Sequence, residues 1–453
     1  MKQTLSGYKI HFSGIGGISM SALAKLSKSK GAVVSGSDDF PGETVEQLKG
    51  DGINITNSVK ELEYLPNLLV YTSALKLDAP DIMYAIENGV PIMERHQFLA
   101  KISEDFPYII AVSGTHGKTT VTAVISYIFS LSDKLYTAHI GGNALGLGNC
   151  PSTGEDFFIT EACEYKRSFL SLRPSLGLVL NMECDHPDCY SCEEEIVSAF
   201  RSFGNNSKRV LCLKKDADKL NCEDMQTLSV SHIDNLEFDD KDNCDYYALI
   251  TEAKSGRYKF DFYQGGKLLF KACPTLFGRH NVTNCAFAAA ACLNAGIDVE
   301  TIKKGIDSFK GVARRNEEFG SMGKMRIVFD YAHHPCEISA TLSLARQMAD
   351  KVLVVFQPHT YSRTASYFKD FVEVLRPYYS ILLPTYAARE SAECGKTSKE
   401  LCDAINDSGG RAVYLDDFQS AAEKLKKHKN KFDLAMILGA GDIIDLKKFI
   451  KIK

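Results

Sequence analysis

The sequence predicts an α/β protein built of three consecutive domains. Short apolar runs alternate with helix-like stretches in three separate series along the chain, and this alternation is typical of βα units around a parallel sheet. The chain has 453 residues, enough for roughly three domains of ~100–200 residues each. We therefore expect α/β domains at residues 1–105, 106–312 and 313–453.

The first series predicts strands that alternate with helices within residues 1–105. Its apolar runs are "YKIHFSG", "GAVVSGSD", "NLLVYTSA" and "GVPIMERH". Between them lie the helix-like stretches "SMSALAKLSKSKG" and "APDIMYAIENG". Strands that alternate with helices in this way indicate a parallel sheet with helices on its faces.

The second and third series repeat the pattern. The second runs through "PYIIAVSG", "DFFITEAC" and "LGLVLNMECDHP". From about Leu213 to Pro274 the text is polar and strand-like, which suggests an antiparallel, β-rich appendage before the helical "NVTNCAFAAAACLNAG". The third predicts the strands "MRIVFDYAHHP", "KVLVVFQPH", "SILLPTY", "RAVYL" and "LAMILGAGD".

Composition and charge disfavour several classes of protein. The 53 basic and 57 acidic side chains give a net charge of −4, so we expect no nucleic-acid partner. No apolar run approaches the ~18–20 residues of a membrane helix, and the first residues lack a secretory-signal pattern. The 14 scattered cysteines favour buried thiols in a reducing compartment. We expect a cytoplasmic protein without membrane insertion.

A glycine-rich turn, Ser13-Gly14-Ile15-Gly16-Gly17, joins the first predicted strand to a helix. Glycines let a backbone bring N–H groups and a helix N-terminus up to a phosphate. The turn nearly matches the pattern G-x-G-x-x-G, but Ser19 stands at the third glycine, and Asp38 stands where an acidic residue could meet a ribose hydroxyl. A substrate phosphate site, a dinucleotide oxidoreductase and a plain tight turn are all compatible with this motif.

A second loop lies between the apolar run "YIIAV" and a helix-like stretch, and reads "SGTHGKTT" from Ser113 to Thr120. Its end matches a P-loop, where lysine meets the β- and γ-phosphates, a hydroxyl ligates Mg²⁺ and backbone amides surround the anion. The full P-loop pattern, G-x-x-x-x-G-K-[ST], has a glycine at the position where this chain has Val112. The strand before and the helix after favour ATP binding, for which a hydride-transfer enzyme has no evident use.

Two candidates for metal ligation follow strands of the second series. Glu161 closes "DFFITE", and His186 lies just past "LGLVLNMECD". Ligands bind outside the carboxyl ends of parallel strands, so both side chains could reach a metal ion beside the loop. A capping glutamate and a hydrogen-bonded loop histidine are the alternatives, and Mg²⁺ prefers oxygen ligands over imidazole.

Later polar residues predict further contacts. Asn281 precedes an alanine-rich helix and has the amide donor and acceptor that an adenine edge requires, although a helix N-cap explains it equally well. Asp330 ends a strand and could hold a ribose or a base. His359 and Arg363 follow the next strand and indicate an anion or carboxylate pocket, with a polar surface cluster as the alternative.

Taken together, these motifs closely resemble the Mur ligases of peptidoglycan synthesis. The segments "GIGGISMSALA", "SGSD", "VSGTHGKTT", "NMECDHPD", "GRHNVTN", "FDYAHHPCEI", "FQPHTYSRT" and "LGAGD" occur in the expected order over essentially the whole chain. The resemblance implies a Rossmann-like domain for a UDP-sugar, a central P-loop ATPase domain, and a C-terminal Rossmann-like domain that brings the amino acid and closes over ATP.

The resemblance also implies roles for individual residues. Catalysis would depend on Lys118, Glu161, His186 and Arg314, and Mg²⁺ or Mn²⁺ would be held by Thr119, Glu161 and His186. ATP would be bound by Gly114, Thr115, His116, Gly117, Lys118, Thr119, Thr120, Asn281, Arg314 and Asp330. The UDP-sugar and the amino acid would be bound by Ser13, Gly14, Ile15, Gly16, Gly17, Ser37, Asp38, Ser73, His333, His359 and Arg363.

The implied reaction joins L-alanine to UDP-N-acetylmuramate. ATP phosphorylates the lactyl carboxylate, and the alanine amine attacks the acyl phosphate to leave an amide, ADP and phosphate. Cations around the transferred phosphoryl group and a closed site without water would provide most of the catalysis. We expect the protein to be a monomer or a homodimer. A recycling ligase that attaches a murein tripeptide shares most of these motifs, and an NAD-dependent oxidoreductase explains only the first turn.

Three features depart from the family's commoner pattern. "EACEYKRSFL" has Cys163 and Tyr165-Lys166 where many relatives have "EADESD". Asn316 stands where an aromatic residue is commoner, which puts the packing of that loop in doubt. No lysine lies between Pro187 and Ser207, where other Mur ligases carry a carbamylated lysine, and its absence is expected of the branch that adds L-alanine.

Overall fold

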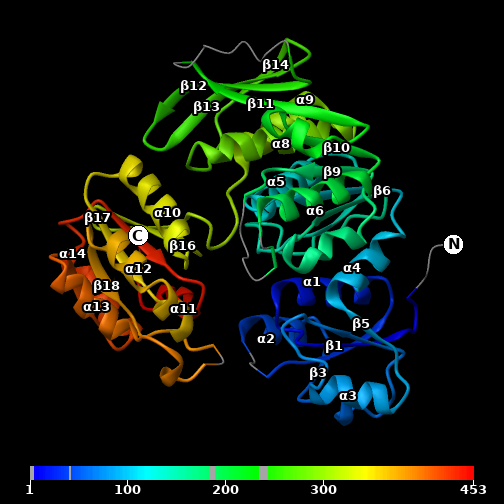
Figure 1. The fold of residues 1–453 in the computed structure, drawn as a ribbon, viewed down its shortest axis with the longest axis horizontal. Helices are drawn as coiled ribbons and strands as arrows, with labels where there is room; N and C mark the ends of the chain where they lie inside the picture. Colours follow the sequence, from blue (N-terminus) through cyan, green and yellow to red (C-terminus); the bar gives the residue numbers. More distant parts are fainter. Residues whose placement is uncertain are drawn as a thin grey trace. The chain divides into compact units, whose positions relative to one another are not determined.

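The computed structural model describes residues 5–39, 42–183, 189–190, 192–233, 243–388 and 390–452. Three β-sheets with flanking helices make up the chain (Figure 1), so the predicted three-domain α/β architecture is confirmed. The chain divides into two compact units: Met1–Glu252 with Lys259–Thr275 and His280–Lys310, and Ala253–Tyr258 with Leu276–Arg279 and Gly311–Lys453. The domain boundaries at 105 and 312 stay predictions.

The first sheet contains five parallel strands in the order β3-β2-β1-β4-β5. The strands are β1 (Lys9–Ser13), β2 (Val33–Ser37), β3 (Asn54–Thr56), β4 (Leu68–Tyr71) and β5 (Ile92–Glu94), and the helices are α1 (Ile18–Ser29), α2 (Glu43–Gly50), α3 (Pro80–Glu87) and α4 (Arg95–Ser103). Parallel neighbours require crossover connections, which these helices supply. Ile10 and Phe12 of β1 are fully buried in the core.

A buried carboxylate ties this sheet together. Asp81, in the first turn of α3, accepts hydrogen bonds from the hydroxyls of Ser13, Ser37 and Ser58 and from the amide of Val59. Because these partners come from β1, β2 and the segment before β4, one side chain links three parts of the first sheet.

The central sheet contains nine strands in the order β14-β13-β12-β11-β10-β9-β6-β8-β7. Its first strands are β6 (Tyr108–Ser113), β7 (Tyr136–His139), β8 (Phe157–Glu161), β9 (Leu176–Val179) and β10 (Arg209–Leu213). They are followed by β11 (Met225–His232), β12 (Tyr246–Lys254), β13 (Arg257–Gln264) and β14 (Lys267–Ala272). The helices are α5 (Lys118–Ser130), α6 (Glu193–Asn205), α7 (Ala217–Leu220), α8 (His280–Asn294) and α9 (Val299–Ser308).

The predicted antiparallel appendage is wrong in part. β11 pairs in parallel with both β10 and β12, so these strands extend the central sheet, and antiparallel pairing is found between β13 and β14. Alternating polar and apolar residues show that a strand has one covered face, but they do not specify the direction of its neighbour. Whether neighbouring strands run parallel or antiparallel depends on which distant segments pair, and the alternation of polar and apolar residues carries no information on that pairing.

The third sheet has the order β15-β16-β20-β17-β18-β19, with β15 antiparallel to β16. Its strands are β15 (Glu317–Met322), β16 (Met325–Asp330), β17 (Val352–Phe356), β18 (Tyr379–Leu382), β19 (Arg411–Tyr414) and β20 (Leu434–Leu438). The helices are α10 (Pro335–Met348), α11 (Tyr361–Ser366), α12 (Phe368–Leu375), α13 (Ser398–Asp407) and α14 (Phe418–His428), with the 3₁₀ segment η7 (Asp442–Lys448).

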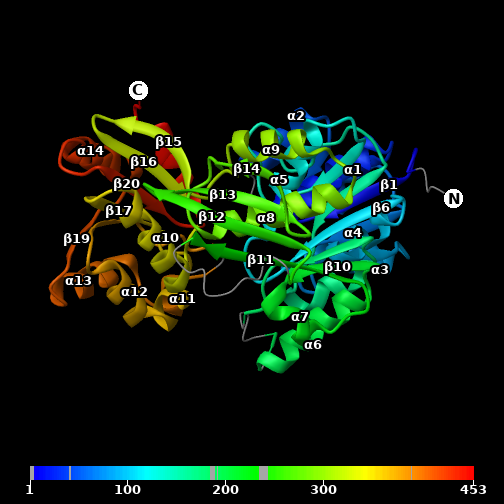
Figure 2. The same cartoon turned by 90° about the horizontal axis from the view of Figure 1, so that it is seen from above.

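Helices cover both faces of this sheet (Figure 2). Val354 and Phe356 of β17 pack in the core with residues of α10, α12 and α13, whereas Leu353 and Val355 pack with residues of α14 and η7. Both sides of the strand are therefore buried, and that is the reason why its sequence is a continuous apolar run.

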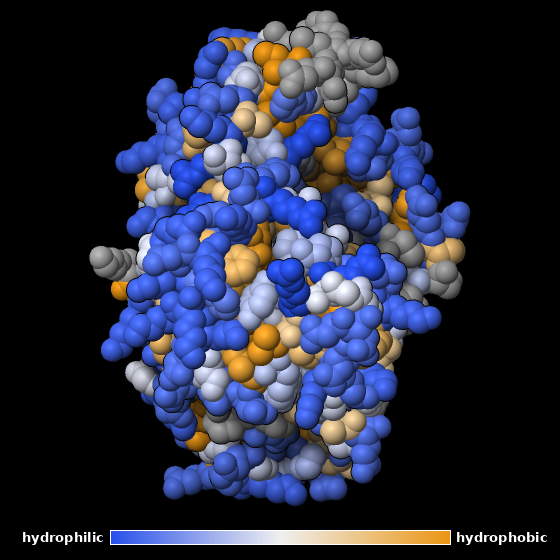
Figure 3. Space-filling model, turned by 90° about the vertical axis from the view of Figure 1, so that its left-hand side faces the viewer, coloured by the Kyte–Doolittle hydropathy of each residue, from blue (hydrophilic) through white to orange (hydrophobic). Residues whose placement is uncertain are grey.

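The surface is mainly polar on the face drawn in Figure 3. Within the described residues, none of the helices combines the length and the hydrophobicity needed to cross a membrane.

We expect Asp81→Asn to destabilise the protein in a pH-dependent way. Burial opposes ionisation, but the hydrogen bonds to the carboxylate lower the pKa of Asp81 well below its ordinary value of 3.8. A carboxylate with a lowered pKa contributes stability that is complete above about pH 4 and is lost as the pH falls below it. Urea denaturation from about pH 3 to about pH 7 should therefore show a steeper acid loss for the wild type than for the variant. Parallel profiles would contradict this role.

Candidate functional site

The loop between β6 and α5 has the geometry of a phosphate-binding loop. Gly114 and Gly117 have φ values of +138° and +88°, a backbone conformation that residues other than glycine rarely adopt. A Cβ on Gly114 would lie 2.9 Å from the Cβ of Leu180, and one on Gly117 would lie 2.6 Å from Oδ1 of Asn284. The predicted strand, loop and helix are all present, so α5 directs its N-terminus at the loop.

Residues that follow β9 hold this loop in shape. The His116 amide donates to Oδ1 of Asn181 at 2.8 Å, and Nδ2 of Asn181 donates to the His116 carbonyl at 3.0 Å. The Thr115 hydroxyl donates to the carbonyl of Glu183 at 3.0 Å. Because the loop is fixed by its neighbours, its backbone amides need little reorganisation to meet an anion.

Lys118 forms a buried ion pair that the motif did not predict. Its Nζ lies 2.9 and 2.8 Å from the two carboxylate oxygens of Glu164, and donates to the carbonyls of Gly114 and Thr115 at 2.6 and 3.2 Å. The side chains are only 15% and 1% exposed. Tyr190 donates from its hydroxyl to the Glu164 carbonyl. In the sequence, this partner could have been suspected only from the second glutamate of "EACEYK", which is Glu164.

Glu161 ends β8 on the same side of the sheet as the loop. Its Oε1 accepts a hydrogen bond from the Gly141 amide at 2.5 Å, and a Cβ on Gly141 would lie 2.6 Å from both carboxylate oxygens. The glycine therefore allows the close approach of the carboxylate. Thr119 lies in the first turn of α5. A carboxylate and a hydroxyl are oxygen donors that suit Mg²⁺, and His186 lies outside the described residues.

Asn281 lies inside α8, as its second residue, and is therefore not an N-cap. Its Oδ1 accepts a hydrogen bond from Nδ2 of Asn284 at 2.8 Å, and both side chains are mostly buried. Since Asn284 lies against Gly117, this pair of amides borders the phosphate loop. An adenine contact for Asn281 stays a prediction.

The first glycine turn is shaped by β2. The amides of Gly14 and Ile15 donate to the Ser37 carbonyl, and the Gly16 amide donates to Oδ2 of Asp38 at 2.8 Å. Asp38 thus holds the turn itself, and a ribose contact for it stays a prediction. Gly17 precedes α1 with no side-chain cap, so the helix N-terminus is available to an anion.

Several residues that were predicted to bind the substrate have side chains that are buried or already hydrogen-bonded within the protein. The hydroxyls of Ser13 and Ser37 are used by Asp81, and the Ile15 side chain is fully buried. Ser73 follows β4 and is half-buried. Any contact that Ser13, Ile15 or Ser37 makes with a ligand would therefore involve mainly the backbone.

In the second unit, Asp330 organises the loop that carries Arg314. Its carboxylate accepts hydrogen bonds from the amides of Asn316 and Ala332 and from the Thr341 hydroxyl; burial raises the pKa of Asp330. Nη2 of Arg314 donates to the carbonyls of Gly439 and Gly441 at 2.8 and 2.9 Å. Asn316 has φ of +46°, a conformation that asparagine tolerates well, which accounts for it in place of an aromatic residue.

His333, His359 and Arg363 lie together, as the strand-end argument predicted. The rings of His333 and His359 are 5.7 Å apart, and Nη1 of Arg363 lies 3.4 Å from Nδ1 of His359. Burial and the nearby positive charge of Arg363 lower the pKa of His359 to about 4, and burial also lowers the pKa of His333. His359 is therefore neutral near pH 7, and Arg363 provides a positive charge for an anion.

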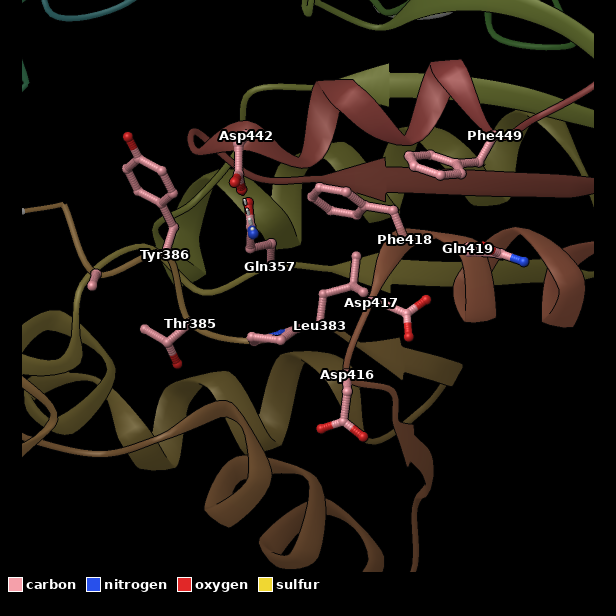
Figure 4. A pocket seen from close by; sticks show the side chains of 12 residues that line it. Gln357, Leu383, Thr385, Tyr386, Asp416, Asp417, Phe418, Gln419, Asp442 and Phe449 are labelled. Atoms are coloured by element: carbon pink, nitrogen blue, oxygen red, sulfur yellow. Dashed lines mark hydrogen bonds between the residues drawn. The ribbon is translucent and has the colours of Figure 1, made fainter. Parts of the chain in front are cut away.

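A cavity of about 600 Å³ lies beside this cluster and was missed by sequence reasoning (Figure 4). Gln357 donates from Nε2 to Oδ1 of Asp442 at 2.7 Å, while its Oε1 accepts from the Ile443 amide. Tyr386 also lines the cavity, and its ring lies 5.4 Å from that of His359. The lining comes from segments that follow β17, β18, β19 and β20, the usual place for ligands on a parallel sheet.

Family models match nearly the whole chain. The model for "Mur ligase family, catalytic domain" matches residues 9–107, that for "Mur ligase middle domain" matches 112–292, and that for "Mur ligase, glutamate ligase domain" matches 314–441. The chain belongs to the Mur ligase family.

Individual Mur ligases are similar over their full length. The UDP-N-acetylmuramate–L-alanine ligase of Clostridium acetobutylicum is 37% identical over 444 residues, covering 97% of this chain and 96% of its own. The enzyme of the same name from Acetivibrio thermocellus is 37% identical over 455 residues, covering 98% and 96%. The crystal structure of UDP-N-acetylmuramate-alanine ligase MurC from Thermotoga maritima has a TM-score of 0.81 at 26% identity, covering 97% and 98%.

A second solved structure shows the breadth of the fold. The murein peptide ligase of Psychrobacter arcticus has a TM-score of 0.69 at 23% identity, covering 98% of this chain and 97% of its own. At that identity the likeness concerns the fold alone.

The Lys118–Glu164 pair should couple strongly in a double-mutant cycle. Removing one partner of a buried ion pair leaves an uncompensated charge and costs about 3–5 kcal/mol. We expect Lys118→Met and Glu164→Gln each to lower the stability markedly, and the double variant to lose less than their sum, by about 1–3 kcal/mol. Chemical denaturation measures all three.

The exposed Lys219–Glu193 pair, also 2.8 Å apart, serves as the matched control. Its side chains are 52% and 59% exposed, so its coupling should stay below about 1 kcal/mol. Equal coupling free energies in the two pairs would refute the claim that burial strengthens the interaction between Lys118 and Glu164.

Proposed function

We infer that this chain joins L-alanine to the lactyl carboxylate of UDP-N-acetylmuramate in an ATP-dependent reaction of peptidoglycan precursor synthesis. The observation that carries this inference is the full-length similarity to relatives named for that activity. The phosphate-loop geometry around Lys118 and the acidic end of β8 support it.

The reaction proceeds in two chemical steps. A carboxylate oxygen of the acceptor attacks the γ-phosphorus of ATP, the bond to the bridging oxygen breaks, and ADP leaves. The amine nitrogen of L-alanine then attacks the acyl carbon, phosphate leaves with its oxygen, and the nitrogen loses a proton. Most of the catalysis of phosphoryl transfer comes from positioning and from charge stabilisation.

Lys118 and the loop amides would bind the ATP phosphates. For this purpose Lys118 has to exchange part of its contact with Glu164 for phosphate oxygens. Thr119, Glu161 and His186 would hold a divalent cation, Mg²⁺ or Mn²⁺, which would offset negative charge on the phosphates. The turn from Gly14 to Gly17, at the N-terminus of α1, would bind the diphosphate of the UDP-sugar.

In the second unit, Arg363 would bind the carboxylate of L-alanine, with neutral His359 and His333 beside it. We keep Arg314 as a phosphate contact and Asn281 and Asp330 as adenosine contacts. Asp330 would act mainly through the loop from Arg314 to Asn316, because its carboxylate is occupied by that loop and by Ala332 and Thr341. Oligomeric state and a cytoplasmic location stay predictions.

An NAD-dependent oxidoreductase would explain only the first glycine turn and is disfavoured, because the chain belongs to the Mur ligase family. The recycling ligase that attaches a murein tripeptide to the same nucleotide sugar is the competing activity within the family. The two activities differ in the amine substrate, so a direct comparison of amines separates them.

Phosphate release from ATP with UDP-N-acetylmuramate should require L-alanine, and the product should be heavier by one alanyl residue. The measurement compares no amine, L-alanine and an L-Ala-D-Glu-containing tripeptide, with mass analysis of each product. Dependence on the tripeptide would instead establish the recycling activity, and no release with any amine would overturn ligation itself.

Lys118→Ala should lose at least about a hundredfold in kcat, because a cation at the transferring phosphoryl group acts chiefly in the transition state. The variant needs a check of folding by circular dichroism, since its Glu164 partner is then unpaired. Unchanged turnover in a folded Lys118→Ala protein would exclude the phosphate loop from catalysis.

A further inference from the structure

Arg95 is a positively charged residue next to the first glycine turn, and sequence reasoning gave it no role. It begins α4 directly after β5 and is half-buried. Its Nη1 donates to the hydroxyl of Ser19 at 3.1 Å. Ser19 lies in the first turn of α1, the helix that follows the Gly14–Gly17 turn. The guanidinium therefore lies at the helix N-terminus, where an anion is expected.

Ser19 also connects this region to the central sheet. Its hydroxyl lies 2.8 Å from Nε2 of His139, and Nδ1 of His139 lies 3.2 Å from the Thr160 hydroxyl. Burial, together with the charge of Arg95, lowers the pKa of His139 to about 4, so this histidine is neutral near pH 7. A neutral imidazole contributes no charge that could replace that of Arg95.

A second contact fixes the same helix. Nδ2 of Asn149 donates to the Ile18 carbonyl at 3.0 Å and to the Ser21 hydroxyl at 3.1 Å. The first turn of α1 is thus hydrogen-bonded to His139 at the end of β7 and to Asn149 in the segment between β7 and β8.

Arg95 shares a small cavity with Glu161, Cys163 and Ser168. Glu161 is the carboxylate that ends β8, next to β6 and the phosphate loop that follows it, so the cavity places Arg95 near the predicted ATP site. Within the described part of the chain, Arg95 makes no ion pair; its hydrogen bond to Ser19 is to an uncharged group. A half-buried guanidinium without a carboxylate partner is a ready site for an anionic ligand.

We propose that Arg95 binds an anionic group of the nucleotide-sugar acceptor and positions its carboxylate beside Glu161. The proposal rests on the proposed function and adds to it a substrate-binding residue. The acceptor has two kinds of anion, a diphosphate and a carboxylate, that must reach the first turn and the ATP site respectively. Arg95 lies between those two places, next to Ser19 on one side and in a cavity with Glu161 on the other.

The test is a set of binding titrations without ATP or amino acid. Calorimetry would compare UDP-N-acetylmuramate, which has both anions, with UDP-N-acetylglucosamine, which lacks the lactyl carboxylate. The proteins are the wild type, Arg95→Ala, Arg95→Lys and, as a control, Lys101→Ala. Lys101 is on the same helix but is exposed and paired with Glu104, so its removal should leave binding unchanged.

We expect Arg95→Ala to weaken binding of UDP-N-acetylmuramate by about tenfold or more, as for the loss of a charge-assisted hydrogen bond. Arg95→Lys should recover part of that loss, because it retains the charge without the planar donor pair. Equal weakening of both nucleotides would identify the diphosphate as the partner, and weakening confined to UDP-N-acetylmuramate would identify the carboxylate. Either result supports the proposal.

Steady-state kinetics separates binding from a structural role. Arg95→Ala should raise KM for UDP-N-acetylmuramate while leaving KM for ATP and the melting temperature close to those of the wild type. Unchanged affinity for both nucleotides in a folded Arg95→Ala protein would overturn the assignment of Arg95. Failure of the wild type itself to bind either nucleotide would overturn the proposed function.

Discussion

Parallel strands bring their carboxyl ends to one edge of a sheet, and the candidate residues of this protein depend on that constraint. β6 ends at the phosphate loop and β8 ends at Glu161, while the segment after β9 supplies the Asn181 amide that holds the loop. In the third sheet, Asp330 ends β16, and His359 follows β17. Because the strands share a direction, side chains far apart in sequence meet at the same edge.

Close approach at that edge requires residues without side chains. Gly114 and Gly117 adopt φ values that only glycine adopts readily, and Gly141 leaves room for the Glu161 carboxylate. Glycines in these loops therefore serve packing as well as turning. The space beside Gly114 and Gly117 is occupied by Leu180 and Asn284, and the loop is also held by hydrogen bonds from the His116 amide to Asn181 and from the Thr115 hydroxyl to the Glu183 carbonyl.

Charge is the second organising element. Lys118 is balanced by the buried Glu164, whereas Arg95, among the residues that the structure describes, hydrogen-bonds to the uncharged hydroxyl of Ser19 and forms no ion pair. A cation with a buried counter-charge can be held in place until phosphate replaces that charge, and a cation without one attracts an anionic ligand. The two residues thus suit different steps in the binding of a charged nucleotide and a charged sugar acceptor.

The sequence alone determined the strand and helix alternation, the two glycine turns and the family, because apolar periodicity and short motifs are local properties. It also placed Glu161 and Asp330 at strand ends, where the structure has them. Only the tertiary structure decided that β11 and β12 continue the central sheet in parallel, and that the hydroxyls of Ser13 and Ser37 donate hydrogen bonds to Asp81. It also decided that Glu164 pairs with Lys118 of the phosphate loop and that Arg95 hydrogen-bonds to Ser19 after the first glycine turn. These facts depend on contacts between segments distant in the chain, and no local pattern of residues specifies which distant segment a side chain will meet.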